Sequence, residues 1–207
     1  MKEFWRKHWQ TLLNLLLFAC IGVYAANKTV SAYVSGEFDL VEIAFALHNT
    51  VFLIIILIRR QHQAVNTNLF HQGIALVAFF SGMLFQETVT PSLILLRISQ
   101  VIIVVAWLLG VATLINLGRS FGILIAKRDI KTSGLYGVIR HPMYFTDILW
   151  RVGIIIKNPC LINFVVFAAS CACYIYRAVL EERFLRRYPE YQEYMQRVKY
   201  RFLPGLF

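Results

Sequence analysis

Charged residues are scarce in this chain. They make up only 15% of its 207 residues, whereas hydrophobic residues make up 58%. A soluble domain usually contains about 45–50% apolar residues and could not easily bury such an excess. Because the apolar residues form long runs, the sequence predicts an integral membrane protein with one membrane domain and little mass outside the bilayer.

Patterns typical of several enzyme classes and of metal proteins are also missing. The four cysteines, at positions 20, 160, 171 and 173, form no C-x-x-C pair, so neither a zinc site nor a disulfide framework is expected. No P-loop, G-x-S-x-G or G-x-G-x-x-G segment follows a predicted strand, and phosphoryl transfer and serine hydrolysis therefore have no support. No second His, Cys or carboxylate lies at ligand spacing from His141, so no metal is expected there.

Acidic residues are few as well. The 11 Asp and Glu residues stand against 21 Lys and Arg, which gives a net charge of +10. The basic residues cluster at the ends of apolar runs, a placement that favours anionic lipid head groups over nucleic acid as partners. The N-terminus, the Arg59-Arg60 loop, the 118–141 segment and the tail are basic, whereas the 27–37 and 86–91 loops are not. This alternation places both termini and the 118–141 segment in the cytoplasm.

The apolar runs predict an all-α, polytopic membrane bundle of about five or six transmembrane helices. The first run is interpreted as a retained helix, because no clear small-residue cleavage site precedes a soluble domain. Residues 1–117 form the N-terminal helices, and residues 118–207 form a loop, a helical hairpin and an amphipathic cytoplasmic tail that docks back over the loop. The expected helices lie at about 12–26, 38–58, 69–85 and 91–117, with hairpin arms at about 142–156 and 161–187.

Two polar segments border the apolar hairpin. In the first, residues 140–144, Pro142 suits the first turn of a helix, whose free amides and dipole favour an anionic ligand group over His141. The second contains Arg177, Glu181 and Glu182. We interpret the two segments as the halves of one site.

Structural explanations exist for the same residues. Arg177 and Glu181 share one helix face and form, in the simplest account, an ion pair worth a few tenths of a kcal/mol. Glu182 lies about 100° further round the helix and can face something different. An Asp147–Arg151 pair would hold the hairpin to the bundle. His48, inside the second apolar run, is expected to be a hydrogen-bonded bundle residue.

Several of these segments carry a family resemblance. Residues 132–136, residues 140–144 and Glu181-Glu182 resemble the isoprenylcysteine carboxyl methyltransferase family of membrane enzymes, and phospholipid methyltransferases show related patterns. Residues 117–122 and 198–205 are similar to bacterial members. The resemblance implies an S-adenosylmethionine-dependent methyltransferase of a prokaryotic inner membrane. Its acceptor would be lipophilic or lipid-modified, with the carboxylate of an isoprenylcysteine-like or other lipid as the methylated group.

The resemblance also implies roles for single residues. The nucleoside part of the cofactor would lie against Arg128, Asp129, Ile130, Lys131 and Tyr136. Its methionine part and sulfonium would lie against His141, Pro142, Met143 and Tyr144, with Glu181 at the ammonium group and Glu182 beside it. Arg177 would hold the acceptor carboxylate, so that Arg177, His141 and Tyr144 form the catalytic set.

Two other functions fit parts of the sequence. Membrane sterol or enone reductases that use NADPH have a similar R-H-P-x-Y segment, an Asp that matches Asp147 and a comparable tail at Tyr200-Arg201. A non-enzymatic helical membrane scaffold would need the polar segments only as ion pairs.

Overall fold

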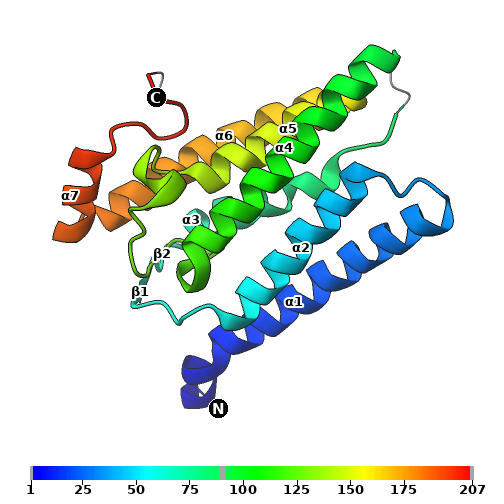
Figure 1. Cartoon of the computed structure of the whole chain (residues 1–207). Coiled ribbons are helices and arrows are strands. Elements are labelled where there is room, and N and C mark those ends of the chain that lie inside the picture. The colour runs from blue at the N-terminus through cyan, green and yellow to red at the C-terminus, as the bar shows by residue number, and fades with distance from the viewer. Residues whose placement is uncertain (1, 89–91, 206–207) are drawn as a thin grey trace.

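The computed structural model describes residues 2–88 and 92–205 and is a helical bundle (Figure 1). Its long helices are α1 (Lys2–Val34), α2 (Leu40–Ile58), α4 (Leu93–Leu117), α5 (Pro142–Lys157) and α6 (Leu161–Leu185). The shorter elements are α3 (Leu69–Phe80), α7 (Pro189–Arg197), the 3-10 helices η1 (Ser81–Leu84), η2 (Gly118–Ser120) and η3 (Gly134–Gly137), and the strands β1 (Ala64–Val65) and β2 (Ala126–Lys127).

Within the described residues, four helical segments are long and apolar enough to cross a membrane, namely Trp9–Val34, Leu40–Ile58, Leu93–Ser120 and Leu161–Leu185. A shorter apolar segment, Leu69–Leu84, combines α3 and η1, and α5 has only 16 residues. Large apolar side chains such as Leu69, Leu93 and Leu161 are at least 78% exposed. Lipid tails can cover such surfaces, and the chain is therefore an integral membrane protein.

The helix ends follow local chemistry. The side chains of Asp39 and Asn68 accept hydrogen bonds from the first free amides of α2 and α3. Pro142 occupies the first turn of α5, as the sequence predicts. Gly118 ends α4 with a φ of +51°, a conformation that favours glycine. Pro91, where the sequence places the start of the fourth helix, lies outside the described residues.

Residues Gly118–Gly122 match the letters G-x-S-x-G but do not form a nucleophile elbow. That elbow requires a strand followed by a helix. Here the segment follows helix α4 and begins with the 3-10 turn η2. Ser120 therefore lacks the strand–turn–helix backbone of such an elbow.

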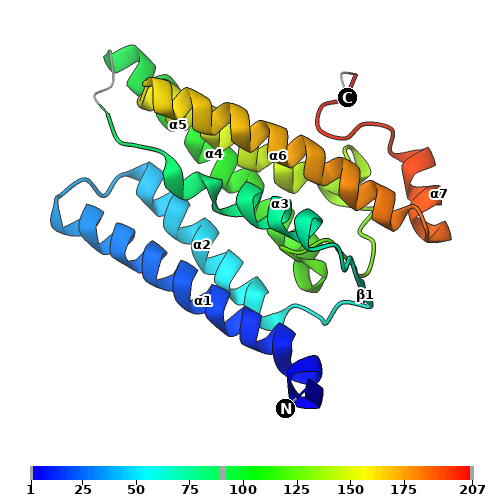
Figure 2. The same ribbon diagram turned by 180° about the vertical axis from the view of Figure 1, so that it is seen from behind.

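In the bundle, α4 lies between α2 and the α5–α6 hairpin, α1 covers the outer side of α2, and α3 packs along α6 (Figures 1 and 2). The α4–α5 contact is close because Gly153 has no side chain. A Cβ atom there would lie 2.5 Å from Ile103 Cγ1. The packing of α4 against α5 fixes the start of α5, where the first polar segment lies.

Arg151 anchors α5 to the break between α3 and η1. It is 1% exposed, and its guanidinium donates to the backbone oxygens of Asp147 (2.7 Å) and Ala78 (3.4 Å) and to Ser81 Oγ (3.3 Å). The Asp147 carboxylate instead accepts a hydrogen bond from the Tyr174 hydroxyl at 2.9 Å. Arg151 thus holds the hairpin to the bundle, but through carbonyl oxygens and a hydroxyl.

The C-terminal tail docks back over the 118–141 loop, as predicted. The amides of Arg140 and His141 donate to the backbone oxygens of Tyr200 and Arg201, each at 2.9 Å. Strands β1 and β2 form a small antiparallel pair at the same end of the bundle, where Ala64 lies opposite Lys127. The α1–α2 and α5–α6 turns lie at the opposite end (Figure 1).

Candidate active site

One cavity lies where the loop, the hairpin and the tail meet. Its volume is about 150 Å³. Its lining includes both His141 and Glu181, so the structure brings the two polar segments together. The predicted site residues that line it are Arg128, Asp129, Ile130, Lys131, Tyr136, His141, Met143, Tyr144, Arg177 and Glu181. Pro142 and Glu182 are not part of this lining.

The start of α5 positions His141 and Tyr144 on one wall. His141 directly precedes the first turn, and its ring stacks on the Tyr144 ring with centroids 5.1 Å apart and planes at 9°. The Phe202 ring of the tail lies 5.9 Å from the imidazole, tilted by 36°. The tail and the helix start therefore fix the histidine together.

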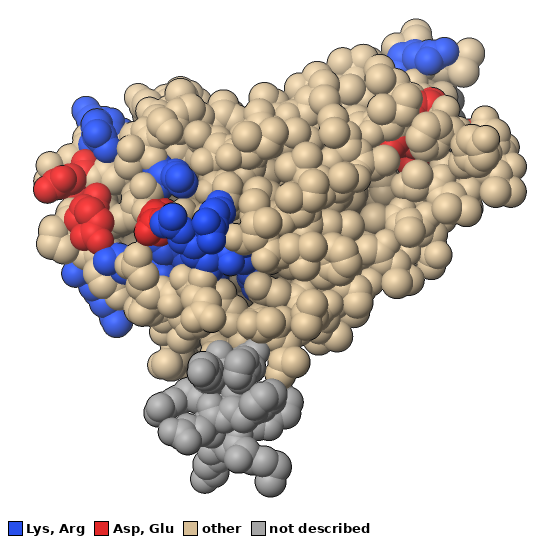
Figure 3. All heavy atoms as spheres, turned by 60° about the horizontal axis from the view of Figure 1, so that its bottom comes forward, with Lys and Arg blue, Asp and Glu red and all other residues tan. Residues whose placement is uncertain are grey.

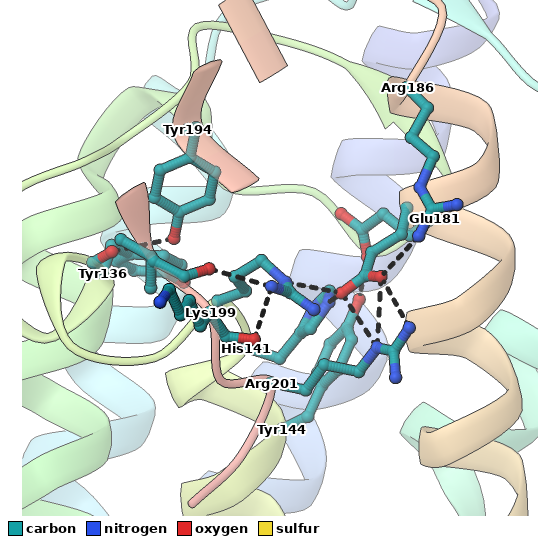
Figure 4. A network of polar contacts seen from close by, with 11 residues as sticks. Tyr136, His141, Tyr144, Glu181, Arg186, Tyr194, Lys199 and Arg201 are labelled. Atoms are coloured by element: carbon teal, nitrogen blue, oxygen red, sulfur yellow. Dashed lines mark hydrogen bonds and ion pairs between the residues drawn. The ribbon is translucent and has the colours of Figure 1, made fainter. Parts of the chain in front are cut away.

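Tyr144 joins α5 to α6 at Glu181 and Arg177. Its hydroxyl donates a hydrogen bond to the Glu181 carboxylate, and the Arg177 guanidinium lies 4.8 Å from the centre of its ring. The labelled side chains of His141, Tyr144 and Glu181 gather in the same region in Figure 4. A carboxylate, a phenol and an imidazole thus share one wall of the cavity.

Arg177 is buried and oriented by backbone oxygens. It is 4% exposed, and it donates to Ala75 O at 3.2 Å, to Gly122 O at 3.5 Å and to Ile123 O. Its Nε has no hydrogen-bond partner among the described residues. The simple Arg177–Glu181 ion pair is not among the ion pairs of the described part of the chain. The Nε–H group of Arg177 therefore has no hydrogen-bond acceptor among the described residues.

Glu182 faces away from the cavity, into a cluster of cations. It is 1% exposed, and its Oε1 accepts from Arg140 Nε at 2.8 Å and contacts His141 Nε2 at 3.2 Å. Arg201 from the tail contacts Oε2 at 3.0 Å, and Arg186 lies 3.9 Å away (Figure 4). The family resemblance predicts that Glu182 contacts the cofactor. In the structure, Glu182 instead connects α6 to Arg140 and His141 and to Arg201 of the tail.

The loop side of the cavity is built around Arg128. A Cβ atom on Gly122 would lie 2.0 Å from Arg128 Nη1, so only glycine leaves room for the guanidinium. Burial lowers the pKa of Arg128, and its Nε has no partner among the described residues. Asp129, by contrast, is held by Arg60 at 2.6 Å and by Gln63 Nε2 at 3.2 Å. Asp129 is thus already paired, whereas the Nε of Arg128 has no hydrogen-bond partner among the described residues.

Tyr136 closes the loop side against the tail helix. The Tyr194 hydroxyl donates to Tyr136 O at 2.8 Å. Burial, and next the Glu181 charge, raise the pKa of the Tyr136 hydroxyl well above its usual value. Tyr136 therefore remains a neutral hydrogen-bonding group at the cavity wall.

Sequence reasoning missed the part of the lining that comes from α2, α3 and the tail. Phe52, Phe79, Tyr191 and Tyr194 belong to none of these motifs, and only packing brings them to the cavity. His48 also lines it, and its Nδ1 has no hydrogen-bond partner among the described residues. The expectation that His48 is a hydrogen-bonded bundle residue is therefore wrong for Nδ1. The sequence did contain a signal for a functional position here, because an ionisable residue inside an apolar run is energetically costly.

No group of three or more His, Cys, Asp or Glu side chains that could hold a metal ion occurs in residues 2–88 and 92–205.

Comparisons with known proteins agree with the fold. Protein-S-isoprenylcysteine O-methyltransferase B of Arabidopsis thaliana is 33% identical over 106 residues, which are 46% of this chain and 53% of that protein. The chain thus spans about half the length of this curated relative. The solved structure of the eukaryotic intramembrane Ras methyltransferase ICMT (isoprenylcysteine carboxyl methyltransferase) has a TM-score of 0.53, covers 81% of this chain and 67% of its own, and is 20% identical. At that identity it shows a shared fold.

A family profile covers the region that contains most of the cavity-lining residues. The profile of the family described as phospholipid methyltransferase matches residues 85–191, just over half of the 207-residue chain. The match includes the loop, the start of α5 and the Arg177–Glu181 face of α6. The chain belongs to the phospholipid methyltransferase family.

Proposed function

We propose that this chain is an S-adenosylmethionine-dependent methyltransferase that methylates a lipophilic acceptor at the cytoplasmic face of the membrane. The observation that carries the proposal is the shared cavity of His141 and Glu181 in a chain of the phospholipid methyltransferase family. The cavity contains the Glu181 carboxylate, the first turn of α5, and the guanidinium groups of Arg128 and Arg177, whose Nε atoms have no hydrogen-bond partner among the described residues. A zwitterionic, sulfonium-bearing cofactor needs these groups.

The residues of the cavity fit the cofactor. Glu181 would hold the ammonium group, because its carboxylate lines the cavity and has a neutral tyrosine hydroxyl as hydrogen-bond donor. The cofactor carboxylate would lie at the amides that begin α5, where the helix dipole favours an anion. Arg128, with its buried and unpartnered Nε, would contact the nucleoside side together with Tyr136. When bound, S-adenosylmethionine supplies the methyl group on its sulfonium.

The chain's own residues would position the reactants and exclude water. Methyl transfer to an ionised carboxylate is an in-line displacement that requires no strong base, so orientation supplies most of the rate. Arg177, held by three backbone oxygens, is a rigid candidate for orienting an acceptor carboxylate through its Nε–H. The aromatic wall of Phe52, Phe79 and Phe121 suits an apolar acceptor body that enters from the bilayer.

The proposed orientation places the cavity mouth and both termini in the cytoplasm of a prokaryotic cell, in its inner membrane. Most of the charged side chains on this face lie at one end of the molecule, around a basic group, and a few lie at the opposite end, with a broad uncharged surface between them (Figure 3). Basic residues follow the cytoplasmic side of membrane proteins. This distribution supports the predicted topology and a contact with anionic lipids.

Ligand binding to the detergent-solubilised protein tests the proposal directly. Saturable binding of S-adenosylhomocysteine, with no response to NADPH, is expected for a methyltransferase. Binding of NADPH alone would favour the reductase alternative, and binding of neither would favour a scaffold. Transfer of a tritiated methyl group to lipid extracts and to prenylated small thiols then identifies the acceptor class. Labelled product from neither source would contradict a lipophilic acceptor.

A further inference from the structure

A second carboxylate lines the cavity and has no role in the function proposed above. Asp147 lies on α5, three residues after Tyr144 and four after Met143, so the three side chains share one face of the helix. All three line the cavity. Met143 and Tyr144 are buried, whereas Asp147 is partly accessible. A ligand in the cavity can therefore contact the Asp147 carboxylate.

Two tyrosines connect Asp147 to Glu181. The Tyr174 hydroxyl donates a hydrogen bond to Asp147 Oδ2 at 2.9 Å, and the Tyr144 hydroxyl donates to the Glu181 carboxylate. The centroids of the two tyrosine rings are 5.4 Å apart. The two carboxylates therefore belong to one region of the cavity. Asp147 lies about 4.5 Å, or nearly one helix turn, further from the start of α5 than Tyr144 does.

Within the described residues, neither of these carboxylates forms an ion pair. The ion pairs of that part of the chain include neither Asp147 nor Glu181. The Arg151 guanidinium donates to the backbone oxygen of Asp147 at 2.7 Å, and Arg177 donates to the backbone oxygens of other residues. Carboxylates held away from water are costly unless they are paired, so a positive group on the ligand would stabilise both.

The proposed cofactor carries two positive groups. Its ammonium and its sulfonium are separated by three carbon atoms, and the proposed function gives a carboxylate only to the ammonium, at Glu181. The sulfonium is expected to lie against Met143 and Tyr144, and Asp147 follows them on the same face of α5. Opposite charges attract more strongly in a cavity than in bulk water. Two carboxylates without a cationic partner thus match the two cationic groups of the ligand.

We propose that Asp147 holds the sulfonium and makes the cavity prefer the cofactor to its demethylated product. This rests on the proposed methyltransferase function and adds a specificity residue to it. In methyl transfer, a lone pair of the acceptor forms the new bond to the methyl carbon. The carbon–sulfur bond leaves its electron pair on sulfur, which becomes a neutral thioether. Asp147 then loses its cationic partner, so the product binds less tightly than the cofactor and leaves the cavity more readily.

Calorimetric titration of the solubilised full chain measures this preference without catalysis. The ligands are S-adenosylmethionine, sinefungin (in which a carbon that bears an ammonium group replaces the sulfonium) and S-adenosylhomocysteine, which is neutral at sulfur. The two cationic ligands should bind at least about tenfold more tightly than the neutral one, a size typical of interactions with a charged partner.

Asp147→Asn removes the charge and keeps an oxygen for the Tyr174 hydroxyl. The preference for the cationic ligands should fall to within about twofold, and the affinity for S-adenosylhomocysteine should stay within about twofold of the native value. Asp39→Asn is the matched control. Asp39 is an exposed aspartate that does not line the cavity, and asparagine can replace it as the residue that caps α2. This control should keep the native preference.

Tyr174→Phe carries the test if Asp147→Asn does not stay folded in detergent. The substitution keeps the ring and removes the hydroxyl that holds Asp147 Oδ2. Because the carboxylate is then less well oriented, the preference for the cationic ligands should fall at least about twofold. An unchanged preference in this variant would overturn the proposed position of Asp147.

The outcomes separate this inference from the proposed function. Equal binding of cationic and neutral ligands by the native chain, or a preference that survives Asp147→Asn, would refute the role of Asp147 and leave the methyltransferase intact. Failure of the native chain to bind any of the three ligands would refute the methyltransferase and this inference with it.

Discussion

The charged side chains of Glu181 and Arg177 in the cavity form hydrogen bonds with uncharged groups. Glu181 receives a tyrosine hydroxyl, and Arg177 donates to backbone oxygens. Neither has the other as a direct ion-pair partner in the described structure. Buried charges are stable only when they are paired and hydrogen-bonded. A ligand that carries both a positive and a negative group would therefore supply the missing opposite charge to Glu181 and to Arg177.

Glu181→Gln should weaken the binding of S-adenosylhomocysteine by about tenfold or more, equivalent to about 1.4 kcal/mol. The amide keeps an oxygen for the Tyr144 hydroxyl, so the loss reports the missing charge rather than a collapsed wall. Isothermal titration calorimetry on the solubilised chain measures the change. Glu193→Gln on the exposed side of α7 is the control and should bind as the native chain does. Equal losses in both variants would rule out a specific role for Glu181.

Gly122→Ala should disable Arg128 without unfolding the chain. The new Cβ would lie 2.0 Å from Arg128 Nη1, and a guanidinium at the end of a flexible side chain can move aside. Ligand affinity should therefore fall to the level of Arg128→Ala, and the double variant should be no weaker than either single one. The same titration measures all three. Additive losses would mean that the two residues act separately.

At the scale of helices and strands, much of the bundle could be predicted from the sequence because its signals are local. Apolar runs, Pro142 and the Asn158-Pro159 turn define α5 and the start of α6, and Gly118 marks the end of α4. The β1–β2 pair and the aromatic wall from α2 and α3 could not be predicted, since they depend on contacts between residues far apart in the chain. Within the site, the side-by-side glutamates 181 and 182 show the limit. The sequence motif contains both glutamates. Their side chains point in different directions because consecutive helix residues lie about 100° apart.

Glu182→Ala should detach the tail from α6 and destabilise the chain by about 3–5 kcal/mol, as expected when one partner of a buried ion cluster is removed. Arg140, which is 7% exposed at its side chain, would lose its carboxylate contact. A fall in the thermal unfolding temperature and faster trypsin cleavage near Arg197 are the expected observations. Arg186→Ala is the control, because Arg186 is 56% exposed and lies 3.9 Å from the carboxylate. It should change stability by less than about 0.5 kcal/mol. A native-like tail in Glu182→Ala would show that other contacts hold it.

At the scale of the whole molecule, one end of the bundle holds the cavity, the tail and the basic loops, and the other holds the α1–α2 and α5–α6 turns. This polarity gives the proposed topology a direct test. In a background with the four native cysteines replaced by serine, Thr132→Cys and Ser35→Cys place one thiol at each end, both at exposed positions. A membrane-impermeant maleimide should label Ser35→Cys in intact cells and Thr132→Cys only in inverted vesicles, because basic loops remain in the cytoplasm. Labelling of Thr132→Cys from outside would reverse the orientation and place the cavity mouth away from the cytoplasmic supply of cofactor.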